Sequence, residues 1–180
     1  MKKTIDQIFS TTYQRVLRYL ASHPSGEFTE KEVQEGISVS RAGANFALRA
    51  LVKDGLIEAE KKGKTAFYSV SLDNPLVRQT KVLINLIEIQ PLVLALQNLS
   101  EKVILFGSSA TGTNIEESDI DLFVLTNKPR EVLDTVRKSS QAEKLQLVTK
   151  KPIDYISLKK KDPFFYDEVS RGLTLWEKKK

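Results

Sequence analysis

The segment 101–125, EKVILFGSSATGTNIEESDIDLFVL, constrains the fold of this chain more than any other. Its apolar run, Val103 to Phe106, predicts a short buried strand that ends in a Gly-Ser turn. Ten residues later, Asp119 and Asp121 open a second apolar strand. Side chains two apart on a strand share a face, so these carboxylates repel each other unless a cation lies between them. Mg²⁺, which prefers oxygen ligands, suits that place.

A third apolar run, 153–158, brings a further acidic residue into the same half of the chain. This run predicts a strand that contains Asp154. A buried apolar strand rarely carries an unpaired aspartate, so we expect Asp154 to join the other two carboxylates.

The order of these residues resembles the DNA polymerase beta-like nucleotidyltransferase superfamily, and within it the small minimal enzymes. The shared pattern is an apolar residue, Gly, Ser, a gap, and then acidic-apolar-acidic-apolar. In this chain the pattern is Phe106, Gly107, Ser108, ten residues, and then Asp119, Ile120, Asp121 and Leu122. The ending DPFFYDEVSRGLTLWEK also looks like the closing helix and strand of these enzymes. The resemblance therefore covers about residues 100–177.

This resemblance implies a Mg²⁺-dependent enzyme, with two metal ions, that transfers a nucleoside monophosphate from an NTP to a hydroxyl and releases pyrophosphate. Gly107 and Ser108 would bind the nucleotide, through close backbone approach and a hydroxyl group. Asp119 and Asp121 would hold the metal ions, and Asp154 would complete the second metal site and help activate the acceptor. Some proteins of this kind act on a toxin-like protein partner, and others act on small molecules such as aminoglycosides. The alternative without a catalytic role is that Asp119 is an ordinary turn or cap residue and that Gly107 and Ser108 form an ordinary loop.

One position departs from the pattern of the resembled enzymes. Many of them have an arginine shortly after Gly-Ser, where this chain has Thr111. Loss of a cation beside the triphosphate weakens nucleotide binding or transition-state stabilisation. Lys150, Lys151 or Arg171 could substitute for it. The departure leaves two hypotheses open: a slow enzyme, or a domain that binds nucleotide without turning it over.

The N-terminal third of the chain predicts helices followed by a hairpin. Apolar spacing and capping residues predict three helices: from Ser10 to about Ser22, a short one after Thr29 that Gly36 ends, and one over 41–54 capped by Ser38 or Ser40. Strands are then expected over 56–60 and 65–70, around a Lys-rich turn at 61–64.

This order resembles the winged helix-turn-helix domain of the ArsR and MarR regulators over residues 10–72. The phrase SVSRAGANFALRALVKDGLIEAEKKGKTAFYSV matches their recognition helix, Gly stop, strand and Lys-rich wing. The resemblance implies binding to duplex DNA, with base-edge contacts from the helix and phosphate contacts from the wing. The residues we expect to contact DNA are Ser40, Arg41, Asn45, Arg49, Lys61, Lys62 and Lys64.

Two alternatives remain open in this region. Phe46 lies off the apolar row of its helix, so it either packs against a neighbouring element, which we favour, or contacts a thymine methyl group. The basic residues could also form only a solvated helix face and a charged turn.

Residues 74–99 connect the two parts and are more apolar than a free linker requires. Pro75 can start a helix, and Pro91 is expected to break the segment into two helices. The apolar side chains pack either into the core of the chain itself, which we favour, or into a homodimer interface. Charged residues interrupt this stretch, so we expect no membrane helix.

Composition sets the remaining limits. The 180 residues contain no cysteine, which excludes disulfides and thiolate zinc sites, and the net charge of +5 is compatible with a polyanionic partner. We expect an α+β cytoplasmic protein with a winged helix domain at 1–73, a helical connector at 74–99, and a nucleotidyltransferase domain at 100–180 with a mixed sheet flanked by helices. The competing hypothesis is a transcriptional regulator whose second domain senses nucleotide without catalysis.

Overall fold

In the computed structural model, which describes residues 2–179, the contacts divide the chain into two units, Met1–Ile87 and Glu88–Lys180. Each unit combines helices with one sheet, and the sheet of the second unit is mixed. The expected α+β fold class is therefore confirmed.

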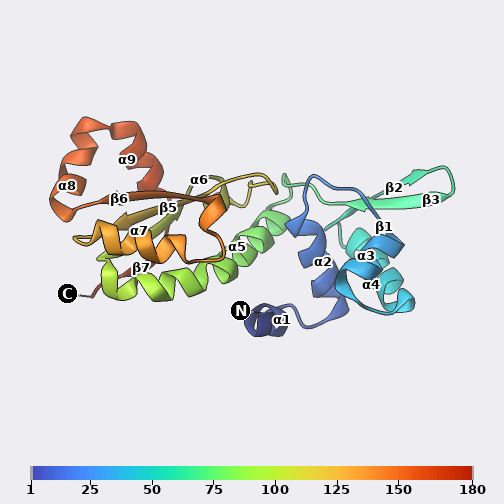
Figure 1. The fold of residues 1–180 in the computed structure, drawn as a ribbon. Coiled ribbons are helices and arrows are strands. Elements are labelled where there is room, and N and C mark those ends of the chain that lie inside the picture. Colours follow the sequence, from blue (N-terminus) through green and yellow to red (C-terminus); the bar gives the residue numbers. More distant parts are fainter. Residues whose placement is uncertain (1, 180) are drawn as a thin grey trace. The chain divides into compact units, whose positions relative to one another are not determined.

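The first unit contains helices and a small antiparallel sheet (Figure 1). Its elements are α1 (Lys2–Ile8), α2 (Thr12–Ser22), β1 (Phe28–Thr29), α3 (Glu30–Ile37), α4 (Arg41–Lys53), β2 (Glu58–Lys62) and β3 (Thr65–Ser69). The strand order is β1-β3-β2, and the register pairs Lys62 with Thr65 across the turn of the β2–β3 hairpin. Two of the lysines assigned to the turn, Lys61 and Lys62, thus belong to β2.

Side chains that cap the helices fix where they begin. Thr29 and Glu32 form the expected capping box of α3, and Ser40 caps α4 through a bond from the Gly43 N–H at 3.1 Å. The cap of α2 is Thr11 rather than Ser10, because Thr11 forms a second capping box with Gln14.

Helix α3 runs one residue past Gly36, where its end was expected. The helix continues to Ile37, and Ser38 ends it with a positive φ of 52°. Gly36 instead leaves room for a ring: a Cβ there would lie 2.5 Å from Cε2 of Tyr19.

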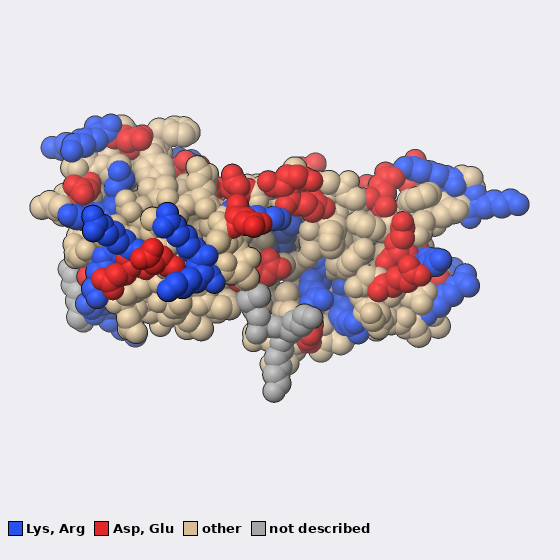
Figure 2. Space-filling model, viewed as in Figure 1, with Lys and Arg blue, Asp and Glu red and all other residues tan. Residues whose placement is uncertain are grey.

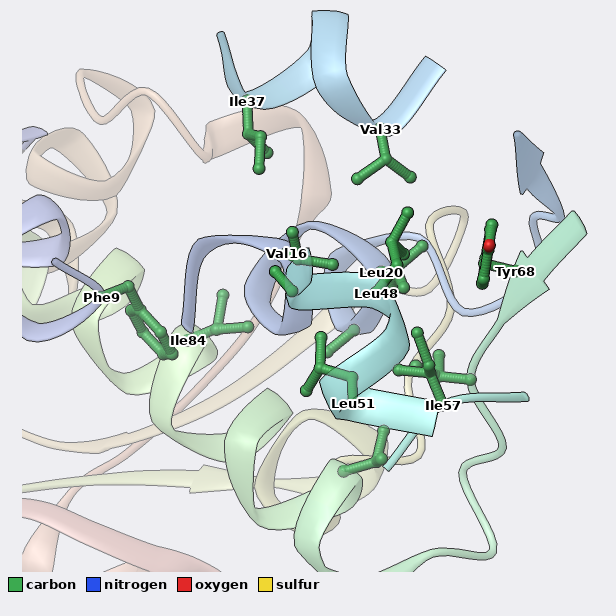
Figure 3. Packing of buried hydrophobic residues seen from close by; sticks show 14 of the residues in the cluster. Phe9, Val16, Leu20, Val33, Ile37, Leu48, Leu51, Ile57, Tyr68 and Ile84 are labelled. Atoms are coloured by element: carbon green, nitrogen blue, oxygen red, sulfur yellow. The ribbon is translucent and has the colours of Figure 1, made fainter. Parts of the chain in front are cut away.

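The buried face of α4 forms the centre of the first core (Figure 3). Leu48 and Leu51 pack among residues of α2 and the hairpin region, including Leu20, Ile57 and Tyr68. Phe46 lies outside this core with 77% of its surface exposed, so the favoured expectation that it packs is wrong. Its position on α4 turns it away from the row that the core uses.

A single helix, α5 (Pro75–Leu96), replaces the two helices expected around Pro91. Pro91 lies inside it on an exposed position, where solvent can satisfy the carbonyl that loses its N–H partner. The buried residues on either side of Pro91, Ile89 and Leu92, hold the backbone helical through their packing.

The apolar residues of α5 belong to the cores of both units, in agreement with the favoured alternative. Val77, Ile84 and Ile87 join the first core, whereas Ile89, Leu92, Val93 and Leu96 join the second. Within residues 2–179, the stretch Pro75–Leu99 is the one helical segment long and apolar enough to cross a membrane, judged by length and composition alone. Core helices pass the same test, and both cores take side chains from this helix.

The second unit is a four-stranded sheet with helices on both faces (Figure 1). Beyond α5, its elements are η1 (Gln97–Leu99), β4 (Lys102–Phe106), α6 (Gly107–Thr111), β5 (Ile120–Leu125), α7 (Pro129–Arg137), η2 (Ala142–Lys144), β6 (Leu145–Lys150), α8 (Pro152–Lys161), α9 (Pro163–Ser170) and β7 (Leu173–Glu177). The strand order is β6-β5-β4-β7; β4 is antiparallel to both neighbours, and β5 and β6 are parallel.

Alternate residues of the central strands point to the two faces of this sheet. Val103, Leu122 and Val124 pack with α5 and α7 on one face. Ile104, Phe106 and Phe123 pack with Tyr155, Phe165 and Val169 of α8 and α9 on the other. Both faces of β4 and β5 are therefore covered.

The strand expected over 153–158 is wrong, because these residues form helix α8. Pro152 occupies its first turn, a position that suits proline, and Ile153 and Ile156 are exposed rather than buried in a sheet. The strand beside β5 is instead β6, eight residues earlier in the chain.

Candidate functional site

The turn after β4 holds the backbone of Gly107 directly against a carboxylate of β5. Gly107 has a φ of +65°, which glycine adopts without steric cost. A Cβ atom at this position would lie 2.3 Å from Oδ2 of Asp121. The register explains the contact, because Phe106 pairs with Asp121 at the end of the β4–β5 ladder. The structure thus brings together Gly107 and Asp121, two of the residues that the sequence singled out.

Asp119 lies just before β5, one residue outside the strand in which it was expected. It is exposed, and its carbonyl oxygen accepts a 3.5 Å hydrogen bond from the hydroxyl of Ser109 on α6. Partial burial raises the pKa of Asp121, and the negative charges of Glu168 and Asp119 raise it further. Asp119 and Asp121 therefore share an electrostatic environment that disfavours two bare carboxylates.

Asp154 does not lie on a strand beside Asp119 and Asp121, as was expected. It lies exposed in the first turn of α8. The residue beside Asp121 on the neighbouring strand β6 is Gln146, a neutral amide. Among residues 2–179, no three His, Cys, Asp or Glu side chains gather closely enough to hold a metal ion. The expectation of a three-carboxylate cluster formed by Asp119, Asp121 and Asp154 is therefore wrong.

Sequence reasoning missed Glu168 of α9, the acid with the largest electrostatic effect on Asp121. Nothing local marks Glu168, because it reaches the site only when α9 packs against β4. Alternation in the LQLVTK segment and the proline at 152 are the signals that would have identified β6 and α8 correctly.

A cavity of about 470 Å³ adjoins the Gly107 turn. Its walls come from α6 and α9 and the residues that follow each: Gly107, Ser108, Ala110, Thr111, Thr113, Phe164, Asp167, Glu168, Arg171 and Gly172. Both predicted nucleotide-binding residues, Gly107 and Ser108, line this cavity. Thr111 also lines it, at the position where the resembled enzymes have arginine.

A model of the nucleotidyltransferase domain family matches residues 86–175, which is 90 of the 180 residues and half of the chain. The chain belongs to the nucleotidyltransferase domain family. The match contains the Gly107 turn, both aspartates and the cavity, so the site lies within the family region of the chain.

Two solved structures are similar to parts of the chain. Reduced HlyU from Vibrio cholerae is 22% identical, and the alignment covers 49% of this chain and 92% of that one, with a TM-score of 0.34. A hypothetical protein of Pyrobaculum spherical virus, PyrSV_gp04, is 20% identical over 79% of this chain and 77% of its own, with a TM-score of 0.31. Likenesses this distant carry no statement about activity. No curated protein matches the chain.

Mg²⁺ fits the donor set of this nucleotidyltransferase domain, although the three-carboxylate form is absent. Asp119 and Asp121 offer carboxylate oxygens. Burial raises the pKa of Asp121 most, and the negative charges of Glu168 and Asp119 raise it further; a bound cation would offset that negative charge. Mg²⁺ is commonly bound by one or two carboxylates, with the remaining ligands from substrate phosphates and water. Asp119 and Asp121 are therefore the residues that could hold it.

The residues predicted to contact DNA lie on α4 and the hairpin of the first unit. The Ser40 hydroxyl is used as the α4 cap. Glu30 of α3 engages two of the others: it accepts a 3.2 Å bond from Nε of Arg41 and a 2.6 Å bond from Nδ2 of Asn45. Arg41 nevertheless keeps 85% of its side chain exposed. Glu30, Arg41, Lys64 and Tyr68 line a cavity of about 620 Å³ between α3, α4 and the hairpin.

The remaining predicted contacts are basic and exposed. Arg49 is exposed on α4, and Lys61 and Lys64 have no ion-pair partner among the described residues. Lys62 pairs with Glu27 and with Glu60, the latter at 3.5 Å. Figure 2 shows basic side chains at the tip of the β2–β3 hairpin with acidic ones beside them. The surface is therefore basic at its tip and mixed in charge behind it.

Proposed function

We propose that the chain is a Mg²⁺-dependent nucleotidyltransferase that transfers a nucleoside monophosphate from an NTP to a hydroxyl acceptor, fused to a DNA-binding winged helix. The observation that carries the catalytic half is the contact between the Gly107 turn and the Asp121 carboxylate in a domain of this family. The contact joins a backbone that can approach phosphates to a carboxylate that can hold their counter-ion.

Each residue of the site has a proposed part in the transfer. The Gly107 turn admits the phosphates close to the backbone, and the Ser108 hydroxyl donates to a phosphate oxygen. Asp119 and Asp121 hold Mg²⁺, which when bound neutralises charge on the phosphates and on the leaving pyrophosphate. The cavity beside the Gly107 turn lies between α6 and α9 and is the proposed place for the nucleotide.

Incubation with labelled NTPs and Mg²⁺ tests this proposal. We expect label transfer to an acceptor, either a partner protein or a small molecule, and its loss when Asp119→Asn and Asp121→Asn are combined. Asp134→Asn on α7 is the matched control, because it removes one exposed carboxylate from the same unit. Asp154→Asn is expected to retain transfer, since Asp154 is exposed in the first turn of α8 and joins no group of three metal-binding side chains among the described residues. Transfer that survives the double substitution would contradict the assigned roles.

A second function is favoured by one specific observation. Gln146 supplies a neutral amide where a third carboxylate beside Asp121 would complete a catalytic cluster. Such a site suits a regulator that binds nucleotide through a Mg²⁺ ion held by two carboxylates, without turning the nucleotide over. Mg²⁺-dependent NTP binding, combined with no transfer to any acceptor, supports this sensor.

The DNA-binding half of the proposal rests on the polar stripe of α4 and the basic tip of the hairpin. Arg41, Asn45 and Arg49 recur every four residues beside the buried face of α4, so they share one stripe, in which the two arginines are exposed and Asn45 is half-buried. We expect binding to duplex DNA that weakens as salt rises. Arg41→Ala combined with Arg49→Ala should lower the affinity, whereas the exposed Arg130 of α7 serves as a matched control. If Arg130→Ala lowered the DNA affinity as much as the double substitution in α4 does, α4 could not be assigned as the helix that contacts the bases.

A homodimer remains part of the proposal, because paired half-sites on DNA suit paired protein subunits. Leu76, Leu83 and Leu94 of α5 are exposed, although its other apolar residues enter the two cores. Sedimentation at micromolar concentration tests this point, and a monomer at every concentration would exclude the dimer.

A further inference from the structure

One face of α9 forms a complete wall of the cavity beside Gly107. Phe164, Asp167, Glu168 and Arg171 all line it, at the spacing i, i+3, i+4 and i+7 of a single helical stripe. Seven residues of helix span about 10 Å, so Phe164 and Arg171 stand at opposite ends of this wall. The opposite wall is α6 with the Gly107 turn.

Phe164 has no role in the core of the unit. Its neighbour Phe165 packs against Phe106, with ring centroids 5.8 Å apart, and belongs to the core between the sheet and α9. Phe164 is 82% exposed, which makes it the most exposed of the large apolar residues described. An aromatic ring at the rim of a cavity is suited to stack on a planar ligand.

Arg171 is the one basic side chain among the described residues that line the cavity. It is exposed at the end of α9 and has no ion-pair partner in the described part of the chain. Lys150 and Lys151, the other candidates to replace a missing arginine, belong to β6 and the start of α8. Arg171 can thus supply, from the α9 side of the cavity, the positive charge that Thr111 does not provide on the α6 side.

We propose that this cavity binds the nucleoside triphosphate with its base stacked on Phe164 and its phosphates held by Arg171. The inference rests on the proposed nucleotide-binding function and assigns two residues to it. Asp167 and Glu168 lie between the two ends, so the phosphates enter this acidic wall only with a divalent cation. Stacking accepts any base, so Phe164 adds affinity for all four NTPs without selecting one.

Two probes separate the roles of these side chains: each NTP, and inorganic tripolyphosphate, which has no base. Calorimetry with Mg²⁺ measures the affinity of the full chain for both. Arg171→Ala is expected to weaken both probes about tenfold or more, because a charged hydrogen bond to phosphate is lost. Phe164→Ala is expected to weaken the NTPs about fivefold or more and to leave tripolyphosphate unchanged. Arg130→Ala and Ile156→Ala are matched controls, because both residues are exposed in the same unit outside the cavity wall.

The outcomes distinguish this inference from the function on which it rests. NTP binding that is lost in the Asp119→Asn, Asp121→Asn chain but unaffected by both cavity substitutions would overturn the inference and leave the function intact. Equal weakening of NTP and tripolyphosphate by Phe164→Ala would overturn the stacking role. A wild-type chain that binds no NTP with Mg²⁺ would remove both. Arg171→Lys should recover part of the loss seen with Arg171→Ala, which a purely structural role would not predict.

Discussion

At the scale of single residues, the site depends on one glycine that touches one carboxylate. Gly107 combines a positive φ with a position at which a side chain would overlap Asp121. Gly63 in the hairpin turn has the same φ of +65°, but a Cβ atom added there would have no neighbour within 4 Å. A substitution at Gly63 therefore measures the cost of backbone strain alone, whereas one at Gly107 adds the cost of the overlap with Asp121.

Gly107→Ala is expected to lower the free energy of unfolding by about 1–3 kcal/mol more than Gly63→Ala does, because only the former overpacks a neighbour. Urea unfolding measures both changes. Equal costs would show that the Asp121 carboxylate moves aside freely, which would contradict the tight contact on which the site depends.

Asp121→Asn is expected to raise the stability of the metal-free chain by up to about 1 kcal/mol near neutral pH, since the carboxylate is partly open to solvent. The folded state raises the pKa of Asp121 above its ordinary value of 3.8 through burial, Glu168 and Asp119. It therefore binds this proton more tightly than the unfolded state, and stability falls as pH rises from about 4 through the raised pKa.

Thermal unfolding at a series of pH values checks this prediction. The wild type should lose stability across that window relative to the Asn variant, with Asp134→Asn as the surface control. A variant that is less stable than the wild type at neutral pH, without metal, would contradict the origin assigned to the raised pKa.

At the scale of elements, contacts between helices modify what each helix presents. Glu30 begins α3 and binds both Arg41 and Asn45 of α4. In the proposed complex, DNA would compete with Glu30 for these side chains and would also meet its negative charge. Glu30→Gln is therefore expected to raise DNA affinity a few-fold at low salt.

Glu35→Gln is the matched control for that change, because it removes the same charge from α3. The Glu35 carboxylate pairs with Lys31 of the same helix at 3.8 Å rather than with a residue of α4. Fluorescence anisotropy with a labelled duplex measures both variants. If both raise the affinity equally, the effect is one of net charge and not of the Glu30 contacts.

Pro91→Ala in α5 is expected to stabilise the chain by about 1–3 kcal/mol, because proline in a helix interior removes a hydrogen bond and crowds the preceding turn. Pro91 is exposed, so its removal leaves no cavity. Gln90→Ala, at the adjacent exposed position, controls for helix propensity. A destabilised Pro91→Ala chain in urea unfolding would show that the helix depends on the proline.

How far the sequence predicted these elements depends on the range of the interactions involved. The capping box at Thr29 and Glu32, the cap at Ser40 and the β4–turn–β5 segment were predicted because their signals lie within a few residues. Helix α8 was mistaken for a strand because Ile153 and Ile156 look like core residues, and only the fold shows them exposed. Glu168 could not be assigned to the site, and Arg171 could not be singled out from Lys150 and Lys151, since the packing of α9 against β4 brings both residues to the cavity beside Gly107.

At the scale of the whole molecule, α5 belongs to both units. The boundary found by contacts, between Ile87 and Glu88, falls inside this helix. The division into three parts at residues 73 and 99 stays a prediction. Val77, Ile84 and Ile87 pack in the first core although they lie beyond residue 73.

A fragment of residues 1–87 is expected to unfold cooperatively, whereas 1–73 should be less stable by several kcal/mol, because it lacks those three buried side chains. Circular dichroism during urea titration compares the two fragments. Equal stability of the fragments would show that the first half of α5 adds nothing to the N-terminal core.

The pairing of Gln146 with Asp121 has a consequence for how the proposed site fills. With two carboxylates and an amide, the protein supplies too few charges to retain a divalent ion tightly by itself, and the ion's other ligands come from the triphosphate. Ion and nucleotide then saturate the site only together. Occupancy follows the product of two cellular concentrations, so the domain would behave as a coincidence detector that stays vacant when either one is scarce.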